Sequence, residues 1–145
     1  MTTQTSTMTY TVSASTRAGG TASVHARTSE IAFDGSAQSG EALPGPADLL
    51  CAALSACILK NVERFSHMLP FRYESASLEV TAEREEPPPR IVRMHYRLRV
   101  VTDEPPARVE LLHKNIRKFG TITNTLAAAC ELTGEIEAVS SGGAT

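Results

Sequence analysis

The chain has 145 residues, 41% of them hydrophobic, with no tryptophan, a formal net charge of −2 at pH 7 and a pI near 6.1. This length fits one domain, and we expect a single domain over residues 1–145 with flexible tails at residues 1–8 and 140–145. The nearly balanced charge gives no reason to expect nucleic acid or an anionic membrane as a partner.

Nothing at the start of the sequence has the pattern of a secretory signal, because "MTTQTSTMTYTVSAS" lacks a basic segment followed by an apolar run. The longest apolar run, residues 49–59, is interrupted by Ser55 and is too short to span a bilayer. We therefore expect a cytoplasmic protein. Three cysteines in a reducing compartment argue against a disulfide framework and leave room for a reactive thiol.

The first third of the chain is predicted to be rich in β-strands. The segments "YTVSAS" and "ASVHAR" alternate in polarity, with Tyr10, Val12 and Ala14 on one face of the first, and "TRAGGT" supplies the Gly-Gly pair of a turn between them. This pattern predicts a β-hairpin. "TSEIAF" is predicted to be a third strand with Ile31 and Phe33 facing inward, and "GSAQSGEALPG" is typical of a loop.

A long helix is predicted from Pro46 to about His67. Pro46 suits the first helical turn, Asp48 complements the helix dipole there, and Leu69-Pro70 ends the helix. The first half, "LLCAALSACIL", is apolar on all sides and must be covered all round, whereas "KNVERFSH" is amphipathic. A chain of this size can hardly cover such a helix alone, so we expect a homodimer.

Two strands with oppositely charged outer faces are predicted next. "SASLEVTAERE" and "IVRMHYRLRVV" both alternate, with glutamates outward on the first and arginines outward on the second. Antiparallel pairing would place Glu79 and Glu83 where Arg93, Arg97 and Arg99 can form ion pairs with them. We prefer this charge-paired sheet face to a nucleic-acid-binding patch.

The last third is predicted to hold two helices and a strand. "PPARVELLHKNIRKFG" is amphipathic, with Val109, Leu112, Ile116 and Phe119 near one stripe and Gly120 at the C-cap. "TITNTLAAACEL" predicts another turn or two of helix, and "GEIEAV" a last strand. The predicted order is β-β-β-α-β-β-α-α-β, an α+β fold.

Cys51 and Cys57 are the candidate reactive side chains of the long helix. They are six residues apart, which places them about 120° apart around the helix and more than one turn apart along it, so they are neither a CxxC pair nor an intrahelical disulfide. A cysteine in an apolar helix is commonly a small core residue. We expect no metal or cofactor, because there is no glycine-rich phosphate loop and the histidines lack ligand spacing: His25, His67, His95 and His113.

The stretch "GPADLLCAALSACILKNVERFS" is similar to the central helix of the OsmC/Ohr family, whose pattern is approximately N/G-P-x-E-L-L-x-A-A-L-x-A-C. The positions that match in register are Gly45, Pro46, Leu49, Leu50, Ala53 and Cys57. The resemblance runs from Tyr10 to Val139 and includes the strand pair and the "IRKFGTITNTL" segment. It implies an OsmC-like fold in which two chains intertwine around buried central helices.

The resemblance also implies an activity. It points to a peroxiredoxin-like thiol peroxidase, a hydroperoxide reductase of oxidative-stress defence, with Cys57 as the nucleophile. A thiolate attacks the O–O bond and becomes a sulfenic acid. In the family an arginine from the N-terminal region holds the thiolate and an acid near the helix start orients it. Arg27 is the preferred arginine over Arg17, and the acid is Asp48, one residue after the position of the peroxidase branch, Ala47.

The family's resolving cysteine is missing, because its position corresponds to Gly120 in "FGTITNTL". Either an external thiol reduces the oxidised protein, or Cys130 replaces the resolver; we prefer to interpret Cys130 as a packed cysteine. A second hypothesis is a non-catalytic or vestigial member of the family that binds a small apolar ligand at the dimer interface. The expected partners are a second copy, a small hydroperoxide or apolar ligand, and an external thiol, with no nucleic acid and no membrane.

Overall fold

The computed structural model of the protein describes residues 4–142, and the outermost three residues of each predicted tail lie outside the described residues. The chain divides after Leu49 into two compact units. The element order is the predicted one. The elements are β1 (Ser13–Thr16), β2 (Thr21–Ala26), β3 (Ser29–Asp34), α1 (Pro46–Met68), β4 (Ser75–Glu85), β5 (Arg90–Val101), α2 (Pro106–Phe119), α3 (Thr121–Ala129) and β6 (Glu131–Val139).

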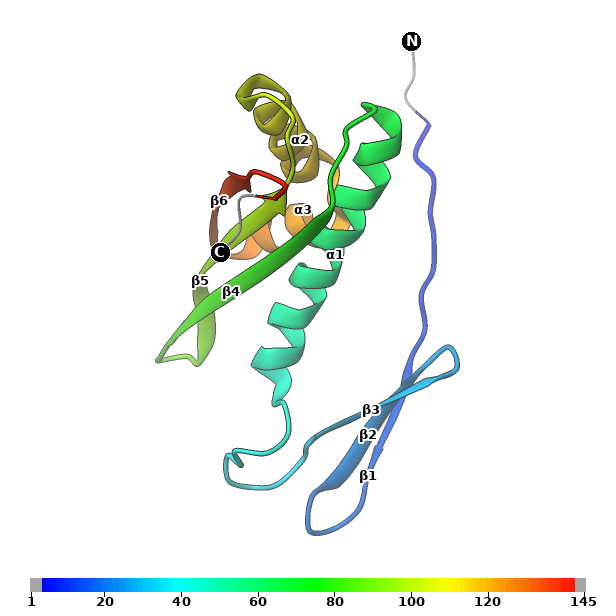
Figure 1. Ribbon diagram of the computed structural model, residues 1–145. Coiled ribbons are helices and arrows are strands. Elements are labelled where there is room, and N and C mark those ends of the chain that lie inside the picture. The colour runs from blue at the N-terminus through cyan, green and yellow to red at the C-terminus, as the bar shows by residue number, and fades with distance from the viewer. Residues whose placement is uncertain (1–3, 143–145) are drawn as a thin grey trace. The chain divides into compact units, whose positions relative to one another are not determined.

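The first unit contains a three-stranded antiparallel sheet in the order β1-β2-β3 (Figure 1). The predicted hairpin is confirmed. Gly19 and Gly20 form its turn with φ angles of 100° and 96°, a left-handed conformation that glycine adopts without steric penalty.

Two details of the predicted first sheet are wrong. Strand β1 has only four residues, so Tyr10 and Val12 precede it and are exposed. Ile31, predicted to face inward, is also exposed. The reason is that this sheet has little core of its own: Ala22 is the one buried residue among the described residues of the unit.

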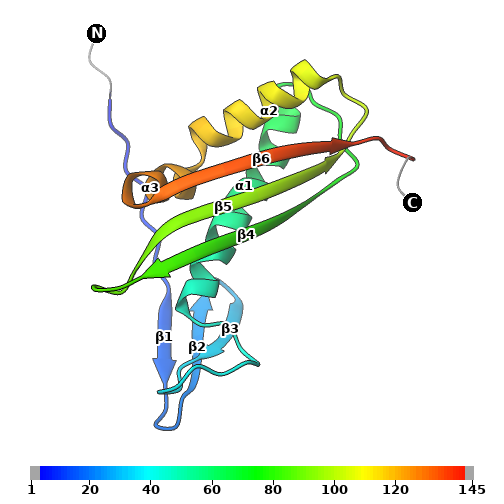
Figure 2. The same ribbon diagram turned by 90° about the vertical axis from the view of Figure 1, so that its left-hand side faces the viewer.

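The second unit is a sheet in the order β4-β5-β6, covered on one face by helices. Strands β4 and β5 are antiparallel, whereas β5 and β6 are parallel because α2 and α3 form the crossover between them. Figure 2 shows α1 crossing behind the strands with α2 beside it. The core forms between these layers from Leu54 and Ile58 of α1, Met94, Tyr96 and Leu98 of β5, and Leu112 and Ile116 of α2.

Helix α1 is confirmed from Pro46 to Met68, and it is buried along one side. Leu54, Ile58 and Phe65 are buried at helical spacing, while Ala52 and Ala56 are exposed. The all-round cover predicted for the first half of the helix is therefore met on one face only in the single chain. The second face offers small apolar side chains to solvent.

A buried tyrosine fixes the pairing of the two parallel strands. Tyr96 of β5 lies in register with Gly134 of β6, and a Cβ at Gly134 would lie 2.0 Å from the ring Cζ of Tyr96. The Tyr96 hydroxyl donates a hydrogen bond to Nε2 of His113 at 2.6 Å. Burial, with a smaller contribution from Arg117, holds the pKa of His113 below its ordinary value, so the imidazole is the neutral acceptor.

The charged sheet face is paired across three strands, which the sequence prediction only partly describes. Arg93 pairs with Glu83, as expected, and with Glu85 at 3.3 Å. Arg97 is in register with Glu79 but forms its ion pair with Glu135 of β6, at 3.0 Å. The predicted partner of Arg97 is therefore wrong, because the parallel strand on its other side supplies a second glutamate.

One boundary and one buried position in the last third also differ from prediction. The final strand starts at Glu131 instead of residue 134, because the strand pairs with β5 from that point on. Phe119, predicted to lie on the core stripe, is 48% exposed and its ring contacts Phe65 at 5.8 Å between centroids.

No helix among residues 4–142 is long and apolar enough to cross a membrane.

Candidate functional site

Cys57 lies in α1, half-buried, with its sulfur beside two polar side chains of the second unit. The amide Nδ2 of Asn61 donates toward the sulfur at 3.9 Å, and the hydroxyl Oγ1 of Thr123 lies 4.0 Å from it. Cys57 is a free thiol. Cys57 is also partly accessible, as a reactive cysteine must be.

Helical geometry places Asn61 next to Cys57, because residues four apart lie on the same face of a helix. Asn61 is only 7% exposed, and its neighbours on the same side of the helix are the buried apolar residues Ile58, Val62 and Phe65. Burying an amide among apolar groups is unfavourable unless the amide forms hydrogen bonds. The contact with the sulfur thus gives a buried donor one of its partners.

Thr123 reaches the site because the chain changes direction at Gly120. Gly120 ends α2 and begins α3, with an extended backbone at φ −79° and ψ 122°, and its carbonyl accepts the first hydrogen bond of α3 from the N–H of Asn124. The next turn carries Thr123, which is 5% exposed, against α1. Sequence analysis did not single out Asn61 or Thr123. A polar residue four positions after Cys57 on an apolar stripe was the one available signal, for Asn61.

Position 120, where the family's resolving cysteine is expected, lies close to Cys57. A Cβ built on Gly120 would lie 2.7 Å from Thr123 Oγ1, and that oxygen is 4.0 Å from the Cys57 sulfur. Because both distances share one oxygen, the Cβ and the sulfur are at most 6.7 Å apart. The structure therefore places position 120 close to Cys57.

The other two cysteines are partly exposed, as Cys57 is. Cys51 and Cys130 both pack against the hydrophobic core of the second unit. Cys130 ends α3 and its thiol donates to the carbonyl of Leu126 at 3.4 Å. It stands seven residues beyond Thr123, about 10 Å along the chain at helical rise. These surroundings favour the packed-cysteine interpretation of Cys130.

Cys57 has two predicted partners, Arg27 and Asp48, and both belong to the first unit. The prediction that Arg27 lies on a strand is wrong, because Arg27 occupies the tight turn between β2 and β3, with φ 55°. Within residues 4–142 it makes no ion pair or side-chain hydrogen bond. Arg17 lies in the β1–β2 turn, as predicted. Their assignment to Cys57 stays a prediction.

Asp48 has a structural role at the start of α1. Its Oδ2 accepts a hydrogen bond from the backbone N–H of Gly45 at 2.9 Å, and the N–H of Leu49 donates to the carbonyl of Gly45 at 3.0 Å. A carboxylate in the first turn that bonds back to the capping residue stabilises the helix start. Its second oxygen remains available for another donor.

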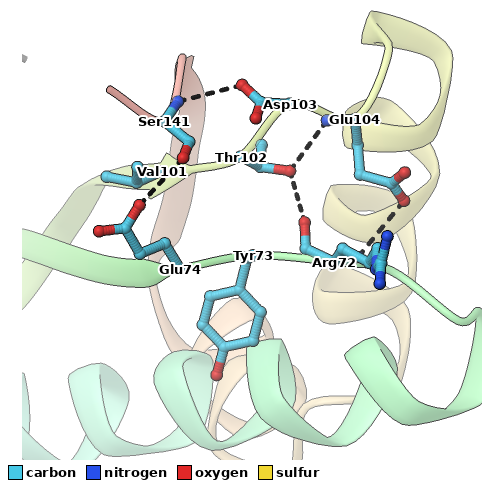
Figure 3. A pocket seen from close by; sticks show the side chains of 8 residues that line it. All are labelled: Arg72, Tyr73, Glu74, Val101, Thr102, Asp103, Glu104 and Ser141. Carbon is cyan, nitrogen blue, oxygen red and sulfur yellow. Dashed lines mark hydrogen bonds between the residues drawn. The ribbon is translucent and has the colours of Figure 1, made fainter. Parts of the chain in front are cut away.

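A polar cavity of about 420 Å³ opens elsewhere in the second unit, at the start of β4 and the end of β5 (Figure 3). Its three carboxylates accept hydrogen bonds from the surrounding loops: Asp103 and Glu74 from Ser141, both at 3.1 Å, and Glu104 from the N–H of Arg72 at 3.4 Å. These bonds close the end of the sheet. No metal-binding group of three or more His, Cys, Asp or Glu occurs within residues 4–142.

The described residues form an α+β fold with a long helix, and this helix carries a free cysteine in contact with polar side chains. Comparison with known proteins identifies the family that has this fold. The OsmC-like protein family model matches residues 38–135, more than half of the chain. The chain belongs to the OsmC family. A search of curated protein sequences gives no significant match.

Solved structures show the same fold at low sequence identity. An OsmC-like protein from Mycoplasma pneumoniae is similar with a TM-score of 0.83 and 15% identity, over 91% of this chain and 98% of that one. An organic hydroperoxide resistance protein OsmC from Legionella pneumophila gives 0.73 and 14%, over 90% and 99%. The organic hydroperoxide resistance protein OhrB of Bacillus subtilis gives 0.67 and 15%, over 88% and 98%.

Proposed function

We propose that the protein is a thiol-dependent reductase of organic hydroperoxides that acts in peroxide stress, with Cys57 as the reactive thiol. The observation that carries the proposal is the surroundings of the Cys57 sulfur: Cys57 is a free, partly accessible cysteine whose sulfur contacts the polar side chains of Asn61 and Thr123. Membership of the OsmC family and the likeness to two hydroperoxide resistance proteins support it.

The proposed reaction has two stages. The thiolate of Cys57 attacks the outer oxygen of the hydroperoxide, the O–O bond breaks, and the sulfur gives up two electrons to become a sulfenic acid. The departing alkoxide takes a proton from water and leaves as an alcohol. A low-molecular-weight thiol then attacks the oxidised sulfur, releasing water and forming a mixed disulfide, and a second thiol molecule reduces this disulfide and regenerates Cys57.

We assign the activation of the thiolate to Arg27, oriented by Asp48. Only one of the two candidate arginines can serve a given sulfur, because Arg17 and Arg27 flank opposite ends of β2, and six strand residues span about 20 Å. Asn is the suitable replacement at Arg27, since it tolerates the left-handed backbone of this turn better than Ala. Arg27→Asn should slow alkylation of Cys57 at neutral pH, and Arg17→Asn should not. The reverse result would transfer the role to Arg17.

We also propose that two copies of the chain associate through the exposed small-residue face of α1, represented by Ala52 and Ala56. An apolar helix with one solvated face gains stability when a second copy covers that face. Light scattering at micromolar concentration should give the mass of a dimer. A cooperatively folded monomer at that concentration would contradict this part of the proposal.

The deciding experiment for function is turnover of an organic hydroperoxide, such as cumene hydroperoxide, with dithiothreitol as reductant. Cys57→Ser should abolish consumption, while Cys51→Ser and Cys130→Ser, matched controls in the same chain, should retain it. Mass spectrometry after peroxide alone should show oxygen added at Cys57, and a small thiol should be captured there as a mixed disulfide. Fewer than one peroxide consumed per chain would favour the alternative, a non-catalytic protein that binds an apolar ligand.

A disulfide between Cys57 and Cys130 in the oxidised protein would revise the second stage only. It would show that Cys130 resolves the sulfenic acid and that dithiol chemistry within the chain replaces the first external thiol. The oxidised protein would then lose two hydrogens instead of gaining oxygen, which intact mass distinguishes directly.

A further inference from the structure

We propose that Asn61 and Thr123 are positioning residues for Cys57, which hold its sulfur in one orientation and donate a hydrogen bond each to the thiolate. The role follows from the contacts of the sulfur at 3.9 Å and 4.0 Å. The positioning role rests on the proposed function only where the attack on peroxide is concerned. The two contacts act on the sulfur of Cys57 whichever compound this sulfur attacks.

The two side chains differ in what they can do. The Asn61 Nδ2 atom has two hydrogens and no lone pair available, so in this contact the sulfur must accept. The Thr123 hydroxyl can both accept and donate. With the neutral thiol it accepts the S–H, and once the thiol ionises the same hydroxyl turns and donates to the sulfur. The Thr123 hydroxyl can therefore keep its contact with the sulfur in either state without any rearrangement of the backbone.

Burial increases the influence of both donors. Asn61 is 7% and Thr123 is 5% exposed, so water competes little for either group. Hydrogen bonds to an ionised acceptor are shorter and stronger than those to a neutral one. The present distances are long for hydrogen bonds to a neutral thiol, and both donors gain when the sulfur becomes negative.

The size of residue 120 is linked to the position of Thr123. Any side chain at Gly120 would place its Cβ 2.7 Å from Thr123 Oγ1 and 3.0 Å from Thr123 Cβ, so Thr123 or the backbone at position 120 would have to shift. A side chain at position 120 therefore disturbs the residue that contacts the Cys57 sulfur. The chain has a hydroxyl beside Cys57 where the family's pattern has a second thiol.

The test is the rate of iodoacetamide alkylation at Cys57 as a function of pH, measured by peptide mass spectrometry on the full chain. Thr123→Val keeps the shape and removes the hydroxyl, and Asn61→Leu removes the amide donor at similar size. Each should slow alkylation at neutral pH about five- to tenfold, since one lost hydrogen bond of ordinary net strength corresponds to roughly that factor, and the comparison is repeated across the pH range. Thr123→Ser, which restores the hydroxyl, should stay within about twofold of the unmodified protein.

Thr125→Val is the matched control. Thr125 stands two residues later on α3 and is exposed, and its hydroxyl donates to the carbonyl of Thr121 at 2.8 Å. Removing it changes the same helix without touching the sulfur, so the alkylation profile should not move. Denaturant unfolding of every variant separates loss of fold from loss of the contact, and Thr123→Val with Thr123→Ser tests the proposal even where Asn61→Leu does not fold.

Alkylation needs no peroxide, so the outcomes separate the two proposals. If Thr123→Val and Asn61→Leu, both folded, alkylate at the unmodified rate across the pH range, the positioning role is wrong. If they are slowed as expected while the unmodified protein consumes no hydroperoxide, the positioning role stands and the reductase proposal is wrong.

Discussion

Replacing Gly120 tests whether packing against Thr123, and not backbone conformation, requires glycine at the α2–α3 junction. The φ of Gly120 is −79° and its ψ is 122°, which any residue adopts. By backbone conformation alone, Gly120→Ala should stabilise the protein by about 0.4–1 kcal/mol, since it restricts the unfolded chain. The surroundings predict the opposite sign.

The structure supplies the size of the opposing effect. The new Cβ would meet Thr123 Oγ1 at 2.7 Å, Thr123 Cβ at 3.0 Å and the carbonyl oxygen of Ile116 at 3.1 Å. Thr123 and Ile116 are both buried, so neither has free space to move into. Overpacking of this kind costs about 1–3 kcal/mol. We expect Gly120→Ala to lower the free energy of unfolding by about that amount.

A double-mutant cycle locates the clash. Thr123→Ala removes the hydroxyl that makes the shortest contact, so Gly120→Ala should be markedly less destabilising in the Thr123→Ala background than alone. Urea denaturation followed by circular dichroism gives all four free energies. A neutral or stabilising Gly120→Ala, or strictly additive effects of the two changes, would refute the reasoning.

The same pair of positions tests the geometry of the missing resolver. Gly120→Cys combined with Thr123→Ala puts a thiol whose Cβ lies at most 6.7 Å from the Cys57 sulfur, so the two sulfurs can meet if the α2–α3 junction shifts toward α1. Oxidation of this double variant should yield a disulfide with Cys57 more readily than oxidation of Gly120→Cys alone. Equal yields would show that Thr123 does not control access to the position.

Three other features make predictions of their own. Gly134→Ala should destabilise the protein by about 3 kcal/mol or more, because its Cβ would overlap the fully buried ring of Tyr96, and thermal unfolding measures the loss. Burial, and secondarily Arg117, lower the pKa of His113 in the folded state, so the unfolded chain binds the proton more readily. The free energy of unfolding should therefore fall as the pH drops from about 6.5 toward the pKa of His113 in the folded protein. His113→Gln should flatten that part of a stability–pH profile. Arg97→Ala should change the free energy of unfolding by less than about 1 kcal/mol, since its ion pair is exposed, and a larger loss in urea denaturation would contradict a simple surface pair.

The sequence by itself determined the order of the elements and the helix that carries Cys57. Strand alternation and helical spacing are local properties of the chain, so α1 and the β4–β5 pair appear with nearly the predicted bounds. The residue pattern around Cys57 was also sufficient to indicate the OsmC family, which the family model matches independently. The sequence also showed that position 120 lacks sulfur.

Only the tertiary structure decided what surrounds the sulfur. Thr123 is 66 residues from Cys57 in the chain, and no periodicity connects them; the direction change at Gly120 brings them together. The turn position of Arg27 and the Glu135 partner of Arg97 depend likewise on strand pairing, which local pattern does not specify. Spacing along the chain fixes which residues share a face of one element, whereas contacts between elements follow from how the whole sequence packs.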